Sequence, residues 1–379
     1  MRNNLSYLIK NTSAVFVIKI IGMGLAFLLQ VILGKLLGVE GFGQYTMFIT
    51  TLNLLVLFTV VGIDNCLIRT IPRIDSEDKL KWRLLRNSIF TTVVLFIIIL
   101  LLSTMFKDKI SLLEKVEDKR VYLIVFLTLI MSSISKVIDG FFQGEKKTLV
   151  TTTFSILLSN MLKILLFLLF YFVFNIGILN AIISYSLSEL ILLVFRLIYL
   201  SFVKKNTKTT KDTIYTKKDY IKFLKYSIAL FAISGTTVLV HSLDKIMINY
   251  YVDTASVGMY KVAESYLGLI TVSVTPFVVF WPMISNLYKE KNIDELKRLL
   301  SFVNKIIALI SIPVIVMMII FSKELFLIFG KNFTKGNGIL YILLIGTVFD
   351  ALTGPMGAVL NMTDYAKFSL FNTTFVAIL

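Results

Sequence analysis

The sequence predicts an all-α protein that crosses a membrane many times. Its mean hydropathy is +0.84, and 57% of its 379 residues are hydrophobic, far more than in soluble globular proteins. Apolar runs of about 20 residues, the length that spans a bilayer as a helix, recur along the whole chain, with polar and often lysine-rich stretches between them. Each run is expected to be helical, because lipid offers backbone groups no water partner.

We expect eleven membrane spans. Their approximate limits are 14–33, 44–68, 88–106, 121–142, 149–174, 176–203, 221–250, 256–287, 302–321, 337–361 and 365–379. The first run has full length and no small-residue cleavage site behind it, so we do not expect a removable signal peptide. Just before the third span, residues 80–86 alternate leucine with basic side chains around Trp82, which indicates a short helix lying at the membrane surface.

The charges of the connecting loops predict the orientation. With the N-terminus in the cytoplasm, the cytoplasmic segments carry 24 lysines and arginines and the external loops carry 9. Such a bias places the lysine-rich loops inside. The strongest contribution comes from residues 204–225, which contain eight lysines and two aspartates. We therefore expect a multi-pass protein of the bacterial cytoplasmic membrane.

Composition excludes several classes of function. A single cysteine, Cys66, and a single histidine, His241, leave no disulfide framework and almost no ligands for a metal site. No P-loop pattern is present, so we expect no ATPase activity. We also expect the protein to use no cofactor and to have no enzymatic activity. The net charge is +16. We attribute it to basic residues that set the orientation in the membrane and contact anionic lipids, and not to binding of nucleic acid.

Short matches between the two halves predict an internal duplication. Gly43-Gln44-Tyr45 returns as Gly258-Met259-Tyr260, 215 residues later. Asp78-Lys79-Leu80-Lys81 returns as Asp294-Glu295-Leu296-Lys297, and Thr152-Thr153-Phe154 as Thr373-Thr374-Phe375. Parallel repeats of this kind are a known transporter plan. We expect an N-terminal lobe of six helices (1–203), a cytoplasmic basic linker (204–220) and a second, equivalent lobe (221–379).

Several stretches resemble a known family. They are Leu36-Leu37-Gly38-Val39-Glu40-Gly41-Phe42-Gly43-Gln44-Tyr45, Gly140-Phe141-Phe142-Gln143-Gly144, Asp244-Lys245-Ile246-Met247-Ile248, Val257-Gly258-Met259-Tyr260-Lys261-Val262-Ala263 and Leu327-Ile328-Phe329-Gly330-Lys331-Asn332-Phe333. They resemble polysaccharide flippases of the O-antigen and capsule type, in the superfamily that also holds multidrug/toxin extruders and oligosaccharidyl-lipid flippases.

The resemblance covers nearly the whole chain. It implies two pseudo-symmetric lobes of six helices around a V-shaped central cavity that opens to each side of the membrane in turn. Members have 12 to 14 helices, so we expect C-terminal helices to be missing from this chain.

Ionisable side chains inside the spans are the candidate functional residues, because each costs ~2.5–3.5 kcal/mol near the bilayer centre unless it faces protein or water. For an anionic lipid-pyrophosphate substrate, the candidates in the cavity are Lys19, Lys163, Glu189, Lys245 and Lys261. The candidates for ion coupling are Asp64, His241, Asp244, Glu264 and Asp350.

Each candidate also has a purely structural interpretation. Lys136 with Asp139, and Lys261 with Glu264, are spaced at i,i+3 and can neutralise each other on one helix face. Lys19 lies near its helix start and can reach the headgroups. His241 can be a hydrogen-bonded packing residue instead of a proton relay. Lys163 has a plausible partner in Glu189 on the neighbouring span.

Three functions compete. The first is a flippase that moves an undecaprenyl-pyrophosphate-linked oligosaccharide across the membrane for cell-surface polysaccharide synthesis, with membrane lipids, a polysaccharide polymerase and chain-length machinery as partners. The second is a drug or cation antiporter of the same superfamily, against which the presence of Lys19 and the lack of a carboxylate in the first span argue. The third is a membrane polysaccharide polymerase, which would need catalytic groups on a large external loop.

Overall fold

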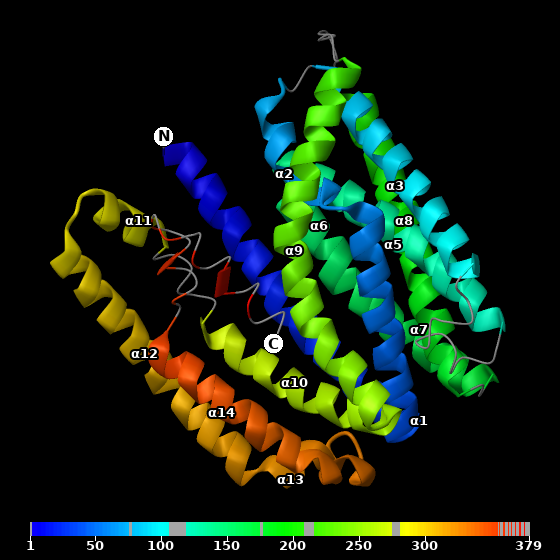
Figure 1. Ribbon diagram of the computed structural model, residues 1–379, viewed down its shortest axis with the longest axis vertical. Helices are drawn as coiled ribbons and strands as arrows, with labels where there is room; N and C mark the ends of the chain where they lie inside the picture. The colour runs from blue at the N-terminus through cyan, green and yellow to red at the C-terminus, as the bar shows by residue number, and fades with distance from the viewer. Residues whose placement is uncertain are drawn as a thin grey trace. The chain divides into compact units, whose positions relative to one another are not determined.

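Helices run through nearly all of the chain in the computed structural model (Figure 1). The structure describes residues 2–75, 78–105, 119–174, 177–207, 216–274 and 281–354, with scattered positions from 356 to 375. Within these residues, eight helices are long and apolar enough to cross a membrane. The protein is therefore an all-α, polytopic membrane protein, as the sequence predicts.

The helical segments of the described residues follow one another along the chain in a fixed order. They are α1 (Arg2–Val60), α2 (Ile63–Thr70), η1 (Ile71–Arg73), α3 (Leu80–Met105), α5 (Lys119–Gly144), α6 (Thr148–Thr152), η3 (Thr153–Leu158), α7 (Ser159–Phe174), α8 (Ile178–Asn206), α9 (Lys217–Tyr251), α10 (Thr254–Val274), α11 (Trp281–Lys289), α12 (Ile293–Ile320), α13 (Ser322–Leu327), η5 (Lys331–Gly336) and α14 (Asn337–Thr353). The predicted last span, 365–379, falls mostly outside the described residues.

Contacts group the chain into two compact units. Unit 1 comprises residues 1–29 and 48–242, and unit 2 comprises residues 30–47 and 243–379. These limits differ from those of the predicted lobes, because residues 30–47 pack with the C-terminal half of the sequence although they belong to the first repeat. The lobes and the linker remain a prediction from the sequence.

α1 contains the first two predicted spans. Gly38 separates them with φ 72° and ψ −178°, a backbone conformation that L-residues with a side chain rarely adopt. The glycine therefore lets two membrane helices follow each other with almost no loop between them. Residues 30–47 on both sides of this kink form the part of α1 that belongs to unit 2.

The second span is broken near its end. α1 stops at Val60, Val61 and Gly62 take φ 46° and 70°, and α2 starts at Ile63. Of the predicted span 256–287, the structure describes α10 as far as Val274 and α11 from Trp281 onward, and residues 275–280 lie outside the described part. The break at Val61 and Gly62 corrects the expectation of one continuous helix over 44–68.

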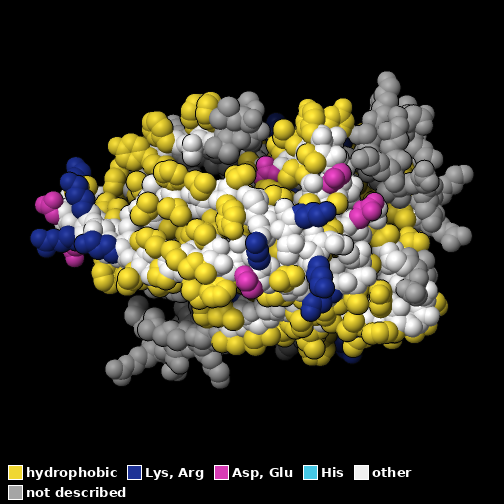
Figure 2. Space-filling model, turned by 90° about the horizontal axis from the view of Figure 1, so that it is seen from below, with side chains coloured by type: hydrophobic (Ala, Val, Ile, Leu, Met, Phe, Trp, Pro, Cys, Tyr) yellow, Lys and Arg dark blue, Asp and Glu magenta, His cyan; other side chains and the backbone are white. Residues whose placement is uncertain are grey.

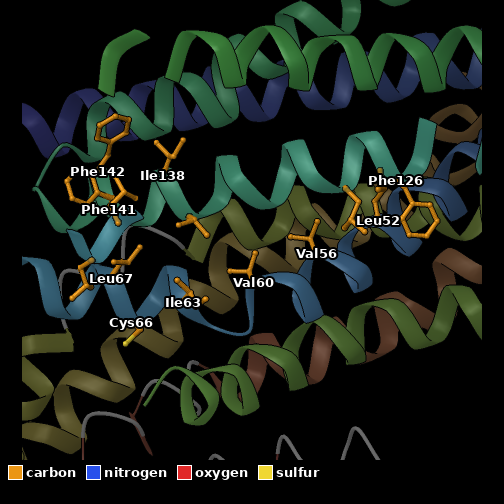
Figure 3. Close-up of a cluster of buried hydrophobic side chains, with 14 of the residues drawn as sticks. Leu52, Val56, Val60, Ile63, Cys66, Leu67, Phe126, Ile138, Phe141 and Phe142 are labelled. Atoms are coloured by element: carbon orange, nitrogen blue, oxygen red, sulfur yellow. The ribbon is translucent and has the colours of Figure 1, made fainter. Parts of the chain in front are cut away.

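The short helix α2 packs on the glycine motif of α5. A Cβ atom at Gly140 would lie 2.7 Å from the Asp64 carbonyl oxygen, and one at Gly144 would lie 3.0 Å from the Leu67 carbonyl oxygen. The motif is thus a G-x-x-x-G pair, whose missing side chains let two helix backbones approach closely. Phe141 and Phe142, between the glycines, are fully buried in the main hydrophobic cluster of unit 1 (Figure 3).

The basic stretch before the third span is not a separate surface helix. It is the first part of α3, and Leu84 and Leu85 are buried in the core. Lys81 is 2% exposed and donates a hydrogen bond of 3.0 Å to Glu145. The expectation failed because the alternation of leucine and basic residues also fits a helix start whose lysine has a buried partner.

In unit 2, α10, α12 and α14 pack together beside α13 and η5. An aromatic cluster joins this bundle to residues 30–47 of α1. Phe42 contacts Phe329 and Phe333, with ring centroids 6.3 and 6.0 Å away, and Tyr266 packs on Phe329. Two of the quoted sequence motifs, 36–45 and 327–333, thus meet in one buried contact. Away from these interiors the surface is mostly hydrophobic, as expected for contact with lipid (Figure 2).

α5 ends in a strained turn that yields a stability prediction. Lys146 has φ 62°, and the next amide, of Lys147, donates to the Phe142 carbonyl oxygen, the arrangement usually closed by glycine. Because a left-handed conformation costs a residue with a side chain about 1 kcal/mol, we expect Lys146→Gly to raise the midpoint of thermal unfolding. The equivalent turn at Lys291 (φ 56°) should respond in the same direction. A fall in both midpoints would contradict this account.

Candidate functional site

Charged side chains inside the spans of unit 1 lie mainly in pairs. The tightest joins Arg196 on α8 to Asp139 on α5, with two hydrogen bonds of 2.9 Å to the two carboxylate oxygens. The Arg196 side chain is 3% exposed. A bidentate arginine–carboxylate pair in such a place fixes the two helices in one register, so this pair has a structural character.

Lys163 is held differently. Its Nζ lies 3.3 Å from a Glu189 carboxylate oxygen and 4.0 Å from the centroid of the Tyr185 ring. Lys163 comes from α7, and Tyr185 and Glu189 lie one turn apart on α8. The sequence predicted this neighbour across spans, and the structure places the two charges together. The face of the Tyr185 ring attracts the Lys163 ammonium electrostatically. Lys163 therefore depends less on its carboxylate partner than Arg196 does.

Asp64 on α2 pairs with a lysine of another helix, α5. Lys136 Nζ lies 3.7 Å from its carboxylate. This corrects the expected pairing of Lys136 with Asp139 on one helix face, because Asp139 binds Arg196. The two side chains of α5 point to different neighbouring helices, and each finds there an opposite charge that spacing along α5 could not reveal.

Unit 2 contains a second charged group, on α9 and α10. Lys245 and Lys261 each donate a hydrogen bond of 2.8 Å to Glu264, one to each carboxylate oxygen. This confirms the predicted pairing of Lys261 with Glu264 and adds Lys245 to it. Beside them, the Tyr260 hydroxyl donates to Asp244 at 2.6 Å. Four candidates of the sequence analysis thus lie in one cluster.

Three other candidates are exposed. Lys19 and Asp350 have no ion-pair partner among the residues that the structure describes, and His241 lies on the exposed side of α9. His241 lies one helical turn before Lys245 on α9. In the described part of the chain, no group of three or more histidine, cysteine, aspartate and glutamate side chains could hold a metal ion.

Sequence reasoning missed two functional features. The position of Tyr185 over Lys163 was not foreseen, although a tyrosine one turn before an intramembrane glutamate is a usable signal. The second feature is Asn160, whose amide donates to the Gly22 carbonyl oxygen of α1 at 3.1 Å and to the Ile156 carbonyl oxygen at 2.9 Å. The latter oxygen lies in η3, a π-helical turn, so Asn160 fastens an irregular helix to α1.

Two family models match the sequence. One, described as polysaccharide biosynthesis protein, matches residues 8–288, and the other, described as MatE, matches residues 234–379. No curated protein sequence matches.

Solved structures resemble the fold. An inward-facing multidrug resistance MATE family transporter of the MOP superfamily is 18% identical with a TM-score of 0.68, over 94% of this chain and 84% of that one. An outward-facing one is 18% identical with a TM-score of 0.62, over 97% and 85%. A MOP superfamily transporter from Pyrococcus furiosus, described by a reverse polarity of its binding pocket, is 16% identical with a TM-score of 0.58, over 97% and 85%.

Proposed function

Because the chain belongs to the polysaccharide biosynthesis protein family and has the fold of MOP superfamily transporters, we propose that it is a flippase for a lipid-linked oligosaccharide. Its cargo would be an undecaprenyl-pyrophosphate-linked sugar chain destined for a cell-surface polysaccharide such as O-antigen or capsule. The transporter class itself rests on the family and the fold. The substrate is our inference from the intramembrane charges.

The observation that carries the proposal is the loose binding of Lys163. Its single contact with Glu189 measures 3.3 Å, against two bonds of 2.9 Å between Arg196 and Asp139. A phosphate oxygen is a strong acceptor for an ammonium, and the Tyr185 ring stays in place when the carboxylate is replaced. Lys163 is therefore the intramembrane cation best suited to exchange its internal anion for that of a substrate.

Glu189 would serve as the counter-ion of the empty transporter. With no substrate bound, it neutralises a lysine that would otherwise be costly inside the membrane. When a pyrophosphate binds, its oxygens would replace the Glu189 carboxylate as the partner of the Lys163 ammonium. The group formed by Lys245, Glu264 and Lys261 has one carboxylate for two lysines, and we propose it as the second place where the anionic substrate is attracted, with Asp64 and Asp244 in ion coupling.

The test is complementation of a flippase-deficient strain. We expect Lys163→Ala to lower surface glycan about tenfold or more, because a hydrogen bond to a charged group contributes ~1.5–3 kcal/mol. Lys163→Arg should keep part of the activity, since either cation attracts a phosphate. The matched control is Lys305→Ala, which removes an exposed lysine of α12. Wild-type glycan from a well-expressed Lys163→Ala variant would reduce Lys163 to a structural partner of Glu189.

A drug or cation antiporter is the second candidate, because the MatE model matches residues 234–379. The two functions differ in the charge that the site must attract. If expression of the protein raises resistance to cationic drugs, and if Lys163→Ala leaves or increases that resistance while no glycan defect is complemented, the antiporter is the correct function.

The orientation in the membrane has its own test. We propose that the protein lies in the bacterial cytoplasmic membrane with its N-terminus inside, near polysaccharide polymerase and chain-length machinery. Cysteines introduced at Thr209 and Ser111 of a Cys66→Ala variant should then react from opposite sides of the membrane; both positions lie outside the described residues. Reaction from the same side would contradict the predicted topology.

A further inference from the structure

A seam of polar side chains joins α5 to α8 within unit 1. The Thr128 hydroxyl oxygen lies 2.6 Å from that of Ser186, and Asp139 accepts two hydrogen bonds of 2.9 Å from Arg196. The two contacts join residues that are 58 and 57 positions apart in the sequence. The two helices therefore run in the same direction and in nearly constant register. α8 packs against both α5 and α7 (Figure 1).

Ser132 lies in this seam, between the two contacts. It is on the same face of α5 as Thr128 and Asp139, one turn after the first and two turns before the second. An offset of 57, the one found for the ion pair, relates Ser132 to Glu189. In the part of the chain that the structure describes, the Ser132 hydroxyl oxygen is buried and has no hydrogen-bond partner. Such a hydroxyl is rare in a protein, and this one lies opposite an intramembrane carboxylate.

The exchange proposed for Lys163 creates a need for such a donor. Among the described residues, Lys163 is the one ionic partner of Glu189. When an anionic substrate takes the ammonium, the carboxylate loses this partner, and a negative charge without partners is costly inside a membrane. A hydrogen-bond donor near Glu189 lowers that cost and makes the exchange easier.

We propose that Ser132 is a positioning residue for this exchange, whose hydroxyl donates to the Glu189 carboxylate when a phosphate of the substrate holds Lys163. The inference rests on the proposed function. The hydrogen of a hydroxyl rotates freely to meet an acceptor, and a hydrogen bond to a charged acceptor is about twice as strong as a neutral one. Contacts on both sides of Ser132 fix the register of α5 and α8, so the exchange involves side chains alone.

This arrangement favours an anionic cargo over a cationic one. A cationic molecule would bind the Glu189 carboxylate itself, and a hydroxyl donor reserved for that carboxylate would then be superfluous. An anionic molecule binds Lys163 and leaves the carboxylate to Ser132. The position of Ser132 is therefore useful for a phosphate-bearing substrate and of no use for a cationic drug.

The first test needs no substrate. With Lys163 in place, Ser132→Ala removes a hydroxyl that has no partner, and the midpoint of thermal unfolding in detergent should stay unchanged. In a Lys163→Ala background, the same change should lower the midpoint by about 3 °C, because the hydroxyl then carries the carboxylate. Equal effects of Ser132→Ala in the two backgrounds would overturn the proposal, since residues that interact give non-additive changes.

Ser135→Ala is the matched control. The Ser135 hydroxyl oxygen is also buried without a partner in the described part of the chain. The offset of 57 places it opposite Leu192, which offers no carboxylate. Its replacement by alanine should have the same small effect whether residue 163 is lysine or alanine.

The second test keeps Lys163 and stays informative if Lys163→Ala fails to fold. In the complemented flippase-deficient strain, Ser132→Ala should lower surface glycan about tenfold. Ser132→Thr keeps the hydroxyl and should retain most of the transport, which a role in packing alone would not explain. Ser135→Ala should transport normally. Full transport by a well-expressed Ser132→Ala variant would refute the positioning role.

The two tests separate this role from the proposed function. If the unmodified protein moves no glycan while the effect of Ser132→Ala on the midpoint depends on Lys163, only the proposed substrate is refuted. If the unmodified protein complements the strain and Ser132→Ala changes neither transport nor the midpoint in either background, the flippase stands and the role of Ser132 is refuted.

Discussion

Replacing Gly140 by leucine is expected to remove the folded protein from the membrane. A Cβ atom there would lie 2.7 Å from the Asp64 carbonyl oxygen and 2.8 Å from the Asp64 Cα, and backbone atoms cannot turn aside as a flexible side chain can. α2 would have to move away from α5 and expose Leu67, Phe141 and Phe142, all of which are fully buried. We expect a loss of about 3 kcal/mol, at the upper end of what overpacking costs.

The measurement is the amount of monodisperse protein recovered in mild detergent, followed by fluorescence of a C-terminal tag during size exclusion. Gly346→Leu on α14 is the matched control, since a Cβ at Gly346 meets no atom within 4 Å. It adds the same bulk to a membrane helix without a close neighbour, and it should leave recovery unchanged. A monodisperse Gly140→Leu protein, as stable as the Gly346→Leu control, would show that α2 does not rely on this contact.

Gly140 also shows which features of the fold the sequence predicts and which it does not. Hydropathy alone predicts that residues 121–142 cross the membrane, and the family resemblance singles out Gly140–Gly144. Neither tells what the glycines are for, because their partner, α2, follows a break at Val61 and Gly62 that no hydropathy pattern marks. The all-α membrane fold was thus predicted correctly. Among the described residues, however, eight helices qualify as membrane spans against the eleven expected, partly because α1 contains the first two predicted spans, and the span 44–68 was read as one unbroken helix.

For the charged residues, spacing was informative only within a helix. Lys261 and Glu264 pair as their i,i+3 spacing predicts, whereas Lys136 turns to Asp64 and leaves Asp139 to Arg196. The choice depends on which helices are neighbours, and on the direction in which each side chain leaves α5. Both are properties of packing. The match between Lys163 and Glu189 was predictable because both are deep in consecutive spans, where an unpaired charge would be expensive.

Arg196→Leu is the second substitution for which we expect a large effect. It would leave Asp139, whose side chain is 14% exposed, without its partner of two hydrogen bonds. Breaking a buried ion pair by removing one member typically costs ~3–5 kcal/mol. Asp139→Leu should be at least as harmful, because it strands an arginine that is 3% exposed. The readout is the midpoint of thermal unfolding in detergent, measured by intrinsic tryptophan fluorescence, to which Trp82, packed on Phe141 in the same unit, contributes.

The double variant Arg196→Leu, Asp139→Leu distinguishes a stranded charge from a packing defect. Removing both charges leaves apolar side chains between α5 and α8, and such replacements are often neutral or even stabilising by ~1–4 kcal/mol. We therefore expect the double variant to recover most of the stability that either single variant loses. If it unfolds as early as Arg196→Leu alone, the guanidinium stabilises the helices through its shape and its contact with the Phe154 ring, whose centroid is 6.0 Å away, and not through its charge. By the same logic, Lys163→Ala with Glu189→Ala should fold normally yet fail to transport, which would separate the exchangeable pair from the structural one.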